Sequence, residues 1–386
     1  MKQKCRQAII VALSLLAVVT QPALGISIPG DTSVGTWNRG TRTYTLTTDV
    51  YETIEIDEDD LTLDGAGYTV TTTLPPIGIY VPGRTGVTVQ NVEVQGCETG
   101  IYVDSGSGNT VTHNTASDNL YGIDVMYSAN SIVTNNTASS NGVGIWASYS
   151  SNSLIANNTA LDNRGGGIYL FDSDDSTVKD NTVFDNNVGM CLHTAHNNTV
   201  TGNTSIDNNL GICFWYSSNN LIYNNNLIDN IRQTFDDNGT ENVFNRPAPE
   251  GGNYWSDHTG PDADIDGFVD SPYLIYDFDG DPIGQDDLPW TVQDGWRKPD
   301  VRIAQLVTEV SHLDIQQGTA NSLESKLDAV RKALDDGNKD NDVAAVNALG
   351  AFINAVDAQR GGKISEEDAD SLIDVAQQII DLLTNS

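Results

Sequence analysis

The chain has 386 residues, of which 53 are acidic and only 19 are basic, so its formal net charge at pH 7 is −34. A chain this negative is repelled by phosphate backbones, which excludes nucleic acid as a partner. Aromatic residues make up only 7% of the sequence. Positions at which they recur are therefore informative.

Residues 1–25 have the organisation of a secretory signal peptide. Lys2, Lys4 and Arg6 precede an apolar run over residues 8–19, and residues 23–25 have the small-x-small pattern of a cleavage site. No later apolar stretch approaches the roughly 20 residues that a membrane-spanning helix requires. The sequence predicts an exported protein without a transmembrane segment. It would be secreted or held at the cell surface, and periplasmic in an organism with two membranes.

A repeat of 22 residues runs through the next part of the chain, and its copies read roughly x-G-I-x-V followed by N-x-x-V-x-x-N-T-A-x-x-N. One spacing is 23 residues, because residues 165–167 contain an additional glycine. The copies begin at Ile77, Thr99, Tyr121, Val143, Gly165, Val188 and Leu210. A period this short fits three brief strands with turns between them, each coil stacking about 4.8 Å above the last.

Aligning the copies produces two columns of asparagine. The first contains Asn114, Asn136, Asn158, Asn181, Asn203 and Asn225, and the second contains Asn119, Asn141, Asn163, Asn186, Asn208 and Asn230. Stacked amides donate and accept along the stack, and Asn tolerates the left-handed backbone of a sharp corner. We therefore predict that these residues form the corners of a β-solenoid.

The repeat, with LTLDGAGYTV at residues 61–70 and GGNYWSDHTGPDADIDGFVDSPYLI at residues 251–275, resembles the NosD-like carbohydrate-binding and sugar-hydrolysis group. The resemblance implies an all-β, right-handed parallel β-helix whose partner is a polysaccharide. We expect an N-terminal cap at residues 26–50, the β-helix at 51–249, and a C-terminal cap with an acidic loop at 250–299.

The composition changes after residue 299, where Asn-rich turns give way to apolar residues at helical spacing. Leu323, Leu327, Val330 and Leu334 form one such stripe. The pattern predicts a small all-α bundle of about four helices at residues 300–386. This region resembles the FIMAH helical domain, which is appended to many secreted hydrolases, and the resemblance implies association with a polymer.

Alternation along the G-I-x-V strand predicts which side chains point out of the coil. The first outward column is Tyr80, Tyr102, Asp124, Trp146, Tyr169, Cys191 and Cys213. The second is Pro82, Asp104, Met126, Ser148, Phe171, His193 and Trp215, flanked by Tyr127, Tyr149 and Tyr216. Aromatic faces stack on sugar rings, so we predict glycan binding by Tyr80, Tyr102, Trp146, Tyr169, Phe171, His193 and Trp215. The alternative is that these rings only stiffen the sheet.

Asp104 and Asp124 are the candidate catalytic residues. They lie two positions and one coil apart, about 8 Å between Cα atoms from strand spacings, which permits the roughly 6.5–9.5 Å carboxyl separation of inverting glycoside hydrolysis. Asp172, Asp174 and Asp175 in the next turn are alternatives. A polysaccharide lyase or epimerase is less favoured, because the outward columns carry no basic residue to neutralise a uronate carboxylate. A neutral or weakly charged glycan suits this face.

Two clusters suggest metals. Asp262, Asp264, Asp266 and the nearby Asp270 resemble the start of a calcium loop, although Tyr273 stands where an EF-hand has its Glu. The alternative is a solvated acidic loop. Cys191, His193 and His196, with Cys213 one coil away, offer soft ligands suited to copper or zinc. We favour a disulfide or free thiols there, because the stacked cysteines lie within bonding range in an exported protein.

Three functional hypotheses result. The first is an exported polysaccharide-binding β-helix protein that hydrolyses its glycan or only binds it. The second is a non-catalytic surface or matrix protein in which the repeat is a rigid spacer. The third, from the Cys/His cluster, is a NosD-like copper accessory protein.

Overall fold

The computed structural model describes residues 25–72, 77–313, 315–334 and 342–384. Residues 1–24, which hold nearly all of the predicted signal peptide, lie outside these ranges. The chain divides into two compact units. The first extends to Phe244 and adds residues 255–257 and 274–285, and the second holds residues 245–254, 258–273 and those from Asp286 onward.

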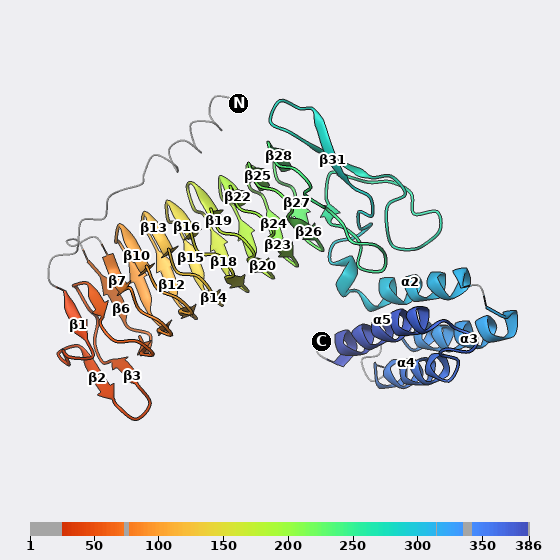
Figure 1. The fold of residues 1–386 in the computed structure, drawn as a ribbon, viewed down its shortest axis with the longest axis horizontal. Helices are drawn as coiled ribbons and strands as arrows, with labels where there is room; N and C mark the ends of the chain where they lie inside the picture. Colours follow the sequence, from red (N-terminus) through yellow and green to blue (C-terminus); the bar gives the residue numbers. More distant parts are fainter. Residues whose placement is uncertain (1–24, 73–76, 314, 335–341, 385–386) are drawn as a thin grey trace. The chain divides into compact units, whose positions relative to one another are not determined.

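The first unit is a right-handed parallel β-helix, as predicted, in which each regular coil, or rung, supplies one strand to each of three sheets (Figure 1). Within the described residues, the first sheet has ten strands: β1 (Ile26–Ile28), β4 (Ile54–Ile56), β7 (Ile77–Pro82), β10 (Thr99–Asp104), β13 (Tyr121–Met126), β16 (Val143–Ser148), β19 (Gly166–Phe171), β22 (Val188–His193), β25 (Leu210–Trp215) and β28 (Arg232–Asp237). Because β1 already pairs with β4, the sheet begins inside the region predicted as a cap.

The other two long sheets are built from strands of two to four residues. In the described chain the second contains β2 (Gly35–Asn38), β3 (Thr43–Leu46), β5 (Thr62–Asp64), β8 (Thr88–Gln90), β11 (Thr110–Thr112), β14 (Ile132–Thr134), β17 (Leu154–Ala156), β20 (Thr177–Lys179), β23 (Thr199–Thr201) and β26 (Leu221–Tyr223). The third contains β6 (Thr69–Thr71), β9 (Glu93–Gln95), β12 (Thr115–Ser117), β15 (Thr137–Ser139), β18 (Thr159–Leu161), β21 (Thr182–Phe184), β24 (Thr204–Ile206), β27 (Asn226–Ile228) and β29 (Tyr254–Trp255). A separate pair comprises β30 (Tyr273–Tyr276) and β31 (Pro282–Asp286).

The predicted asparagine ladders run along the inside of the coil and are buried. The side-chain amide of Asn136 donates to Asn158 Oδ1 at 3.0 Å and to the backbone carbonyl of Val111 at 2.8 Å. The backbone N–H of Asn136 also donates to Asn158 Oδ1, at 3.0 Å. The amide therefore satisfies the backbone at the corner as well as its stacked neighbours, which explains why the chain keeps Asn at a buried position.

The longer rung does not interrupt the ladder, since the Asn158 amide still donates to Asn181 Oδ1 at 3.0 Å across 23 residues. The additional residue is accommodated at the start of β19. A Cβ on Gly166 would lie 2.0 Å from a ring carbon of Tyr169. Only glycine fits beneath that ring.

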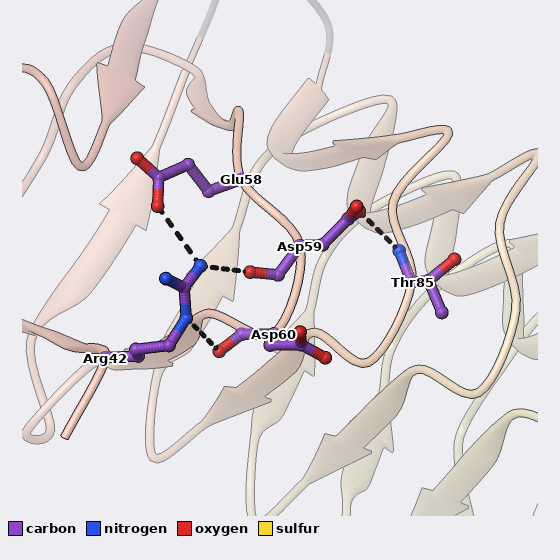
Figure 2. Close-up of polar contacts among 5 residues, drawn as sticks. All are labelled: Arg42, Glu58, Asp59, Asp60 and Thr85. Atoms are coloured by element: carbon purple, nitrogen blue, oxygen red, sulfur yellow. Dashed lines mark hydrogen bonds and ion pairs between the residues drawn. The ribbon is translucent and has the colours of Figure 1, made fainter.

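At the N-terminal end, β2 and β3 form an antiparallel hairpin, and β3 then pairs with β5 in parallel. Figure 2 shows the polar contacts beside this hairpin. Arg42 forms an ion pair with Glu58 at 3.1 Å and donates to the backbone carbonyls of Asp59 and Asp60. The carboxylate of Asp59 accepts the backbone N–H of Thr85 at 2.9 Å. Side chains thus join the first rungs where the asparagine ladders are absent.

The second unit contains the 3-10 helix Gly295–Arg297 and the helices α2 (Pro299–His312), α3 (Gln317–Leu334), α4 (Asp342–Asp357) and α5 (Glu366–Thr384). The predicted stripe residues Leu323, Leu327 and Val330 are buried in one apolar cluster with residues of the other helices. Ser365 Oγ accepts the backbone N–H of Asp368 at 3.0 Å and caps α5. Among the described helices, none combines the length and apolar character needed to cross a membrane.

Candidate functional site

The outer face of the first sheet is formed by three columns of side chains that the parallel register stacks from β7 to β28. The first column is Tyr80, Tyr102, Asp124, Trp146, Tyr169, Cys191, Cys213 and Phe235. The second is Pro82, Asp104, Met126, Ser148, Phe171, His193, Trp215 and Asp237. The third, at the turn after each strand, is Gly83, Ser105, Tyr127, Tyr149, Asp172, Thr194, Tyr216 and Asn238.

Most of the first column is buried, although its side chains point out of the coil. Trp146 is 7% exposed, and Tyr102 and Tyr169 are each 5% exposed. Trp146 stacks on Tyr169 and Phe171, with ring centroids 5.4 and 6.2 Å apart, and meets Tyr121 edge-on at 6.0 Å. The expectation that Trp146 is an open platform is therefore wrong, because rings from neighbouring positions cover it.

The covering residues include a feature that the sequence analysis missed. Val143, Val188 and Leu210 open their strands and pack with Trp146, Tyr169 and the two cysteines in a second apolar cluster outside the coil. The signal was present in the repeat, because the residue before each G-I pair is often large and apolar. Alternation along a strand fixes the direction of a side chain and not its exposure.

The open aromatic surface is a series of rings from the second and third columns, which we call the ring series: Tyr127, Tyr149, Phe171, His193 and Tyr216. Tyr127 stacks on Tyr149, with centroids 4.7 Å apart and planes 10° apart. Phe171 meets Tyr149 edge-on at 5.6 Å and stacks on His193 at 5.0 Å. His193 then meets Tyr216 edge-on at 6.2 Å. Tyr127 is 54% exposed and Tyr216 is 52% exposed, so the series presents rings to solvent over successive rungs.

The three tyrosines of the ring series occupy left-handed backbone positions. The φ angles are 49° at Tyr127, 51° at Tyr149 and 49° at Tyr216. Such a backbone disfavours bulky residues and is tolerated best by Gly, Asn and Asp, which fill most of the other left-handed corners of the β-helix. The backbone therefore does not account for tyrosine here, and the exposed rings themselves require an explanation.

The two predicted catalytic acids lie close enough to interact. Asp124 is 8% exposed, lies in register between Tyr102 and Trp146, and has one carboxyl oxygen, Oδ1, without a hydrogen-bond partner in the protein. Burial and, second, the charge of Asp104 raise the pKa of Asp124 to about 8. Asp104 is half-buried and accepts the Ser105 hydroxyl at 2.7 Å. The pair thus combines a carboxyl that holds its proton at neutral pH with a more exposed carboxyl.

Two more buried polar atoms on the outer face have no partner in the protein. They are Ser148 Oγ, in register between Met126 and Phe171, and Trp215 Nε1. Leaving such an atom unsatisfied costs roughly 1–3 kcal/mol, whereas the buried amides of the asparagine ladders are satisfied. Trp215 packs against Phe235 and Phe278 at 5.0 and 5.8 Å, so it is a less open platform than predicted.

The residues of the Cys/His cluster do not fit a copper or zinc site in this structure. Cys191 and Cys213 form a disulfide between neighbouring rungs, as favoured from the sequence, and both are buried. His193 is stacked on Phe171, and Nδ1 of His196 accepts the backbone N–H of Ser218 at 3.0 Å. The soft ligands that copper prefers are therefore already engaged. The copper that the NosD resemblance implies does not fit these residues.

The acidic loop in the second unit brings three carboxylates together. Oxygen atoms of Asp262, Asp264 and Asp270 all lie within 4.8 Å of one another, the one such group of His, Cys, Asp or Glu in the described part of the chain. Asp262 accepts the backbone N–H groups of Asp266 and Gly267 at 3.0 and 3.1 Å. A set made only of carboxylates suits a hard cation such as calcium and not copper.

Solved structures with parts similar to this chain include two epimerases and a DFA-IIIase. The A-module of a mannuronan C-5 epimerase from Azotobacter vinelandii is 20% identical, with a TM-score of 0.41, over 50% of this chain and 56% of that one. A periplasmic alginate epimerase is 19% identical, with a TM-score of 0.38, over 52% and 67% of the two chains. A DFA-IIIase from Arthrobacter chlorophenolicus is 13% identical, with a TM-score of 0.41, over 57% and 60%. This chain thus covers just over half of the first of these structures, and likenesses this distant say nothing about its activity.

No curated protein matches the chain in sequence. Residues 303–381 match the FIMAH domain, as the helical pattern predicted. Residues 56–260, more than half of the chain, match the family described as periplasmic copper-binding protein (NosD). Because that match spans more than half of the chain and includes the regular rungs from β7 to β28, the chain belongs to the NosD family.

Proposed function

We propose that this protein binds a neutral or weakly charged polysaccharide on the outer face. The main observation in support is the ring series, in which three exposed tyrosines occupy backbone positions that favour Asn or Asp. A ring kept at such a position without a role in backbone geometry is expected to serve a ligand, and sugar rings stack on exposed aromatic faces.

The unpartnered polar atoms support a polyhydroxylated ligand. Asp124 Oδ1, Ser148 Oγ and Trp215 Nε1 include both donors and acceptors on a face that is rich in aromatic rings. Sites that hold small polar ligands combine apolar walls with a few such groups. Sugar hydroxyl groups both donate and accept, so they complement this mixture.

The test compares tyrosines on two faces of the β-helix. Tyr149→Asn and Tyr216→Asn replace a ring with a residue that the left-handed backbone accepts, so the fold should persist. We expect each change to weaken polysaccharide binding roughly five- to tenfold, on the basis of about 1 kcal/mol per aromatic platform. Tyr223→Asn, on the second sheet, is the matched control and should leave affinity unchanged. Binding of the mature protein to a glycan array identifies the ligand. If neither tyrosine change lowers the affinity, the hypothesis that the repeat is a rigid spacer is favoured.

We further propose that a bound glycan is hydrolysed by Asp124 and Asp104. Protonated Asp124 would give its proton to the glycosidic oxygen as the bond from that oxygen to the anomeric carbon breaks. Water would attack the same carbon and release a proton to the Asp104 carboxylate, so that charges and atoms balance. Asp124→Asn and Asp104→Asn should each abolish turnover, and Asp124→Asn should preserve binding. If the unaltered protein binds a glycan and never cleaves it, the protein is a binding module.

Export remains part of this proposal. The N-terminal segment has the organisation of a signal peptide, and the buried Cys191–Cys213 disulfide is typical of an oxidising compartment. Mass spectrometry of protein isolated from its source organism would test both features, because it reports the mature N-terminus and the oxidation state of the cysteines.

A further inference from the structure

The charged side chains in the three columns of the outer face are almost all acidic. Its three columns contain four aspartates and one histidine, and from β7 to β28 these described positions include no lysine or arginine. The aspartates are Asp104, Asp124, Asp172 and Asp237. Arg84, which follows the turn after β7, forms an ion pair with Asp57 at 2.5 Å.

Two of these carboxylates lie beside aromatic rings. Asp172 follows Tyr149 in the third column, and its backbone N–H donates to the carbonyl of His193 at 3.0 Å, so it lies beside two members of the ring series. Asp104 lies two positions after Tyr102 on β10, and the rings of Tyr80 and Tyr102 stack 5.5 Å apart. Strand spacing puts the two carboxylates three rungs apart, or about 14 Å along the sheet. The combination of a ring and an adjacent carboxylate therefore occurs twice on one face.

A second observation at the same face is the buried side chain of Asp124. It is more than nine-tenths buried, its Oδ1 has no partner, and it lies within electrostatic reach of Asp104. A buried polar atom without a partner beside a carboxylate indicates a polar ligand, and an ammonium group is the donor that the Asp104 carboxylate favours. The protein supplies no such donor from the columns of the outer face.

We infer, building on the proposed glycan binding, that the polysaccharide carries free amino groups, and that its ammonium groups bind between carboxylate and ring at Asp104 and Asp172. An ammonium group gains both a charge-assisted hydrogen bond and attraction to the ring face. The same arrangement disfavours uronates, because their carboxylates would face Asp104 and Asp172 without a cation. The ligand class is thus a weakly charged polysaccharide in which some amino sugars are not acetylated.

The experiment uses three hexasaccharides of one linkage that differ only at carbon 2: β-1,4-linked glucosamine, N-acetylglucosamine and glucose. We expect the mature protein at pH 6 and low salt to bind the glucosamine form at least tenfold more tightly than the other two. The preference should shrink as salt is added, because exposed charges are screened. Calorimetry or fluorescence titration measures the three affinities.

Asp172→Asn should reduce the preference for the amine roughly three- to fivefold. Asp185→Asn is the matched control, because Asp185 is an exposed left-handed corner of the same rung, with a φ of 55°, and it lies in another column. Oligolysine of equal charge controls for general attraction to an acidic protein. If Asp185→Asn and Asp172→Asn lower glucosamine binding equally, or if oligolysine binds as tightly, the inference fails.

Failure of this inference can be distinguished from failure of the proposed function. Equal affinity for all three hexasaccharides, or binding only of other glycans on the array, overturns the amine preference and leaves polysaccharide binding intact. Absence of binding to any glycan overturns both. A preference for the amine that survives Asp104→Asn combined with Asp172→Asn also overturns the inference, since those carboxylates are its stated partners.

Discussion

The asparagine ladders and the outer face of the β-helix treat buried polar atoms in opposite ways. Inside, each ladder amide such as Asn158 bonds to its neighbours and to a backbone carbonyl. On the outer face, Asp124, Ser148 and Trp215 each keep an unpartnered atom, and tyrosines occupy corners that suit Asn. Inside the coil, the unpartnered side-chain atoms of the described residues belong to Thr234 and Asp236 of β28, outside the ladder columns. That contrast separates residues kept for architecture from residues kept for a ligand.

The largest effect should come from breaking the ladder. Asn158→Leu removes the acceptor for the backbone and side-chain N–H groups of Asn136, and the donor to Asn181 and Val133. Each buried group left unsatisfied costs roughly 1–3 kcal/mol, so we expect a loss of about 5 kcal/mol in the free energy of unfolding. Asn209→Leu, at an exposed Asn, is the control and should change it by less than about 1 kcal/mol. Chemical denaturation of both variants measures the difference, and equal stability contradicts the ladder argument.

Trp146→Ala should cost about 3–5 kcal/mol, because truncating a buried aromatic side chain leaves a cavity. Tyr149→Asn, at the turn directly after the strand that carries Trp146, should change the free energy of unfolding by no more than about 1 kcal/mol. The ring contact with Tyr127 that it loses is offset by an easier left-handed backbone. The two variants sharpen the distinction between the covered and open parts of the aromatic face. Comparable losses in thermal melts would show that the ring series is also structural.

Stability should depend on pH through Asp124. Its pKa in the folded protein is raised to about 8 by burial and by Asp104, whereas an unfolded Asp titrates near about 3.9. The folded state therefore holds a proton that the unfolded state has lost, and the free energy of unfolding falls as pH rises from about 4 to about 8. Asp124→Asn, which stays neutral, should remove that part of the fall. Melts from pH 4 to pH 9 test this, and an unchanged pH profile would mean that Asp124 is already ionised.

The smallest effect concerns the acidic loop. We propose that calcium binds Asp262, Asp264 and Asp270, with Asp266 nearby, and stabilises the folded form by mass action, by about 2.7 kcal/mol at a hundredfold excess over the Kd. A chelator should lower the melting temperature and expose residues 257–281 to proteolysis. Asp264→Asn should abolish the response. No effect of calcium on either readout would leave a solvated acidic loop.

The sequence predicted the repeat, the three-stranded rungs and the asparagine corners, because those depend on local periodicity and on stacking between identical residues. It also predicted which columns leave the coil. It did not predict that Trp146 and Tyr102 are covered, because the exposure of a ring depends on how the side chains of adjacent rungs pack over it. The sequence shows a tyrosine at position 149, but only the three-dimensional structure shows that its backbone is left-handed.

The disulfide has a consequence for how the chain reaches its fold. Because the copies of the repeat are so similar, one whole copy can loop out while the two flanking copies stack directly on each other. The apolar columns and the asparagine ladders of the flanking copies would still be in register. Cys191 and Cys213 are 22 residues apart and bonded between adjacent strands. A molecule in which the copy that carries Cys191 had looped out would hold the two thiols out of reach of each other. Oxidation of this pair therefore retains only chains in which the copies that begin at Val188 and Leu210 are stacked on each other.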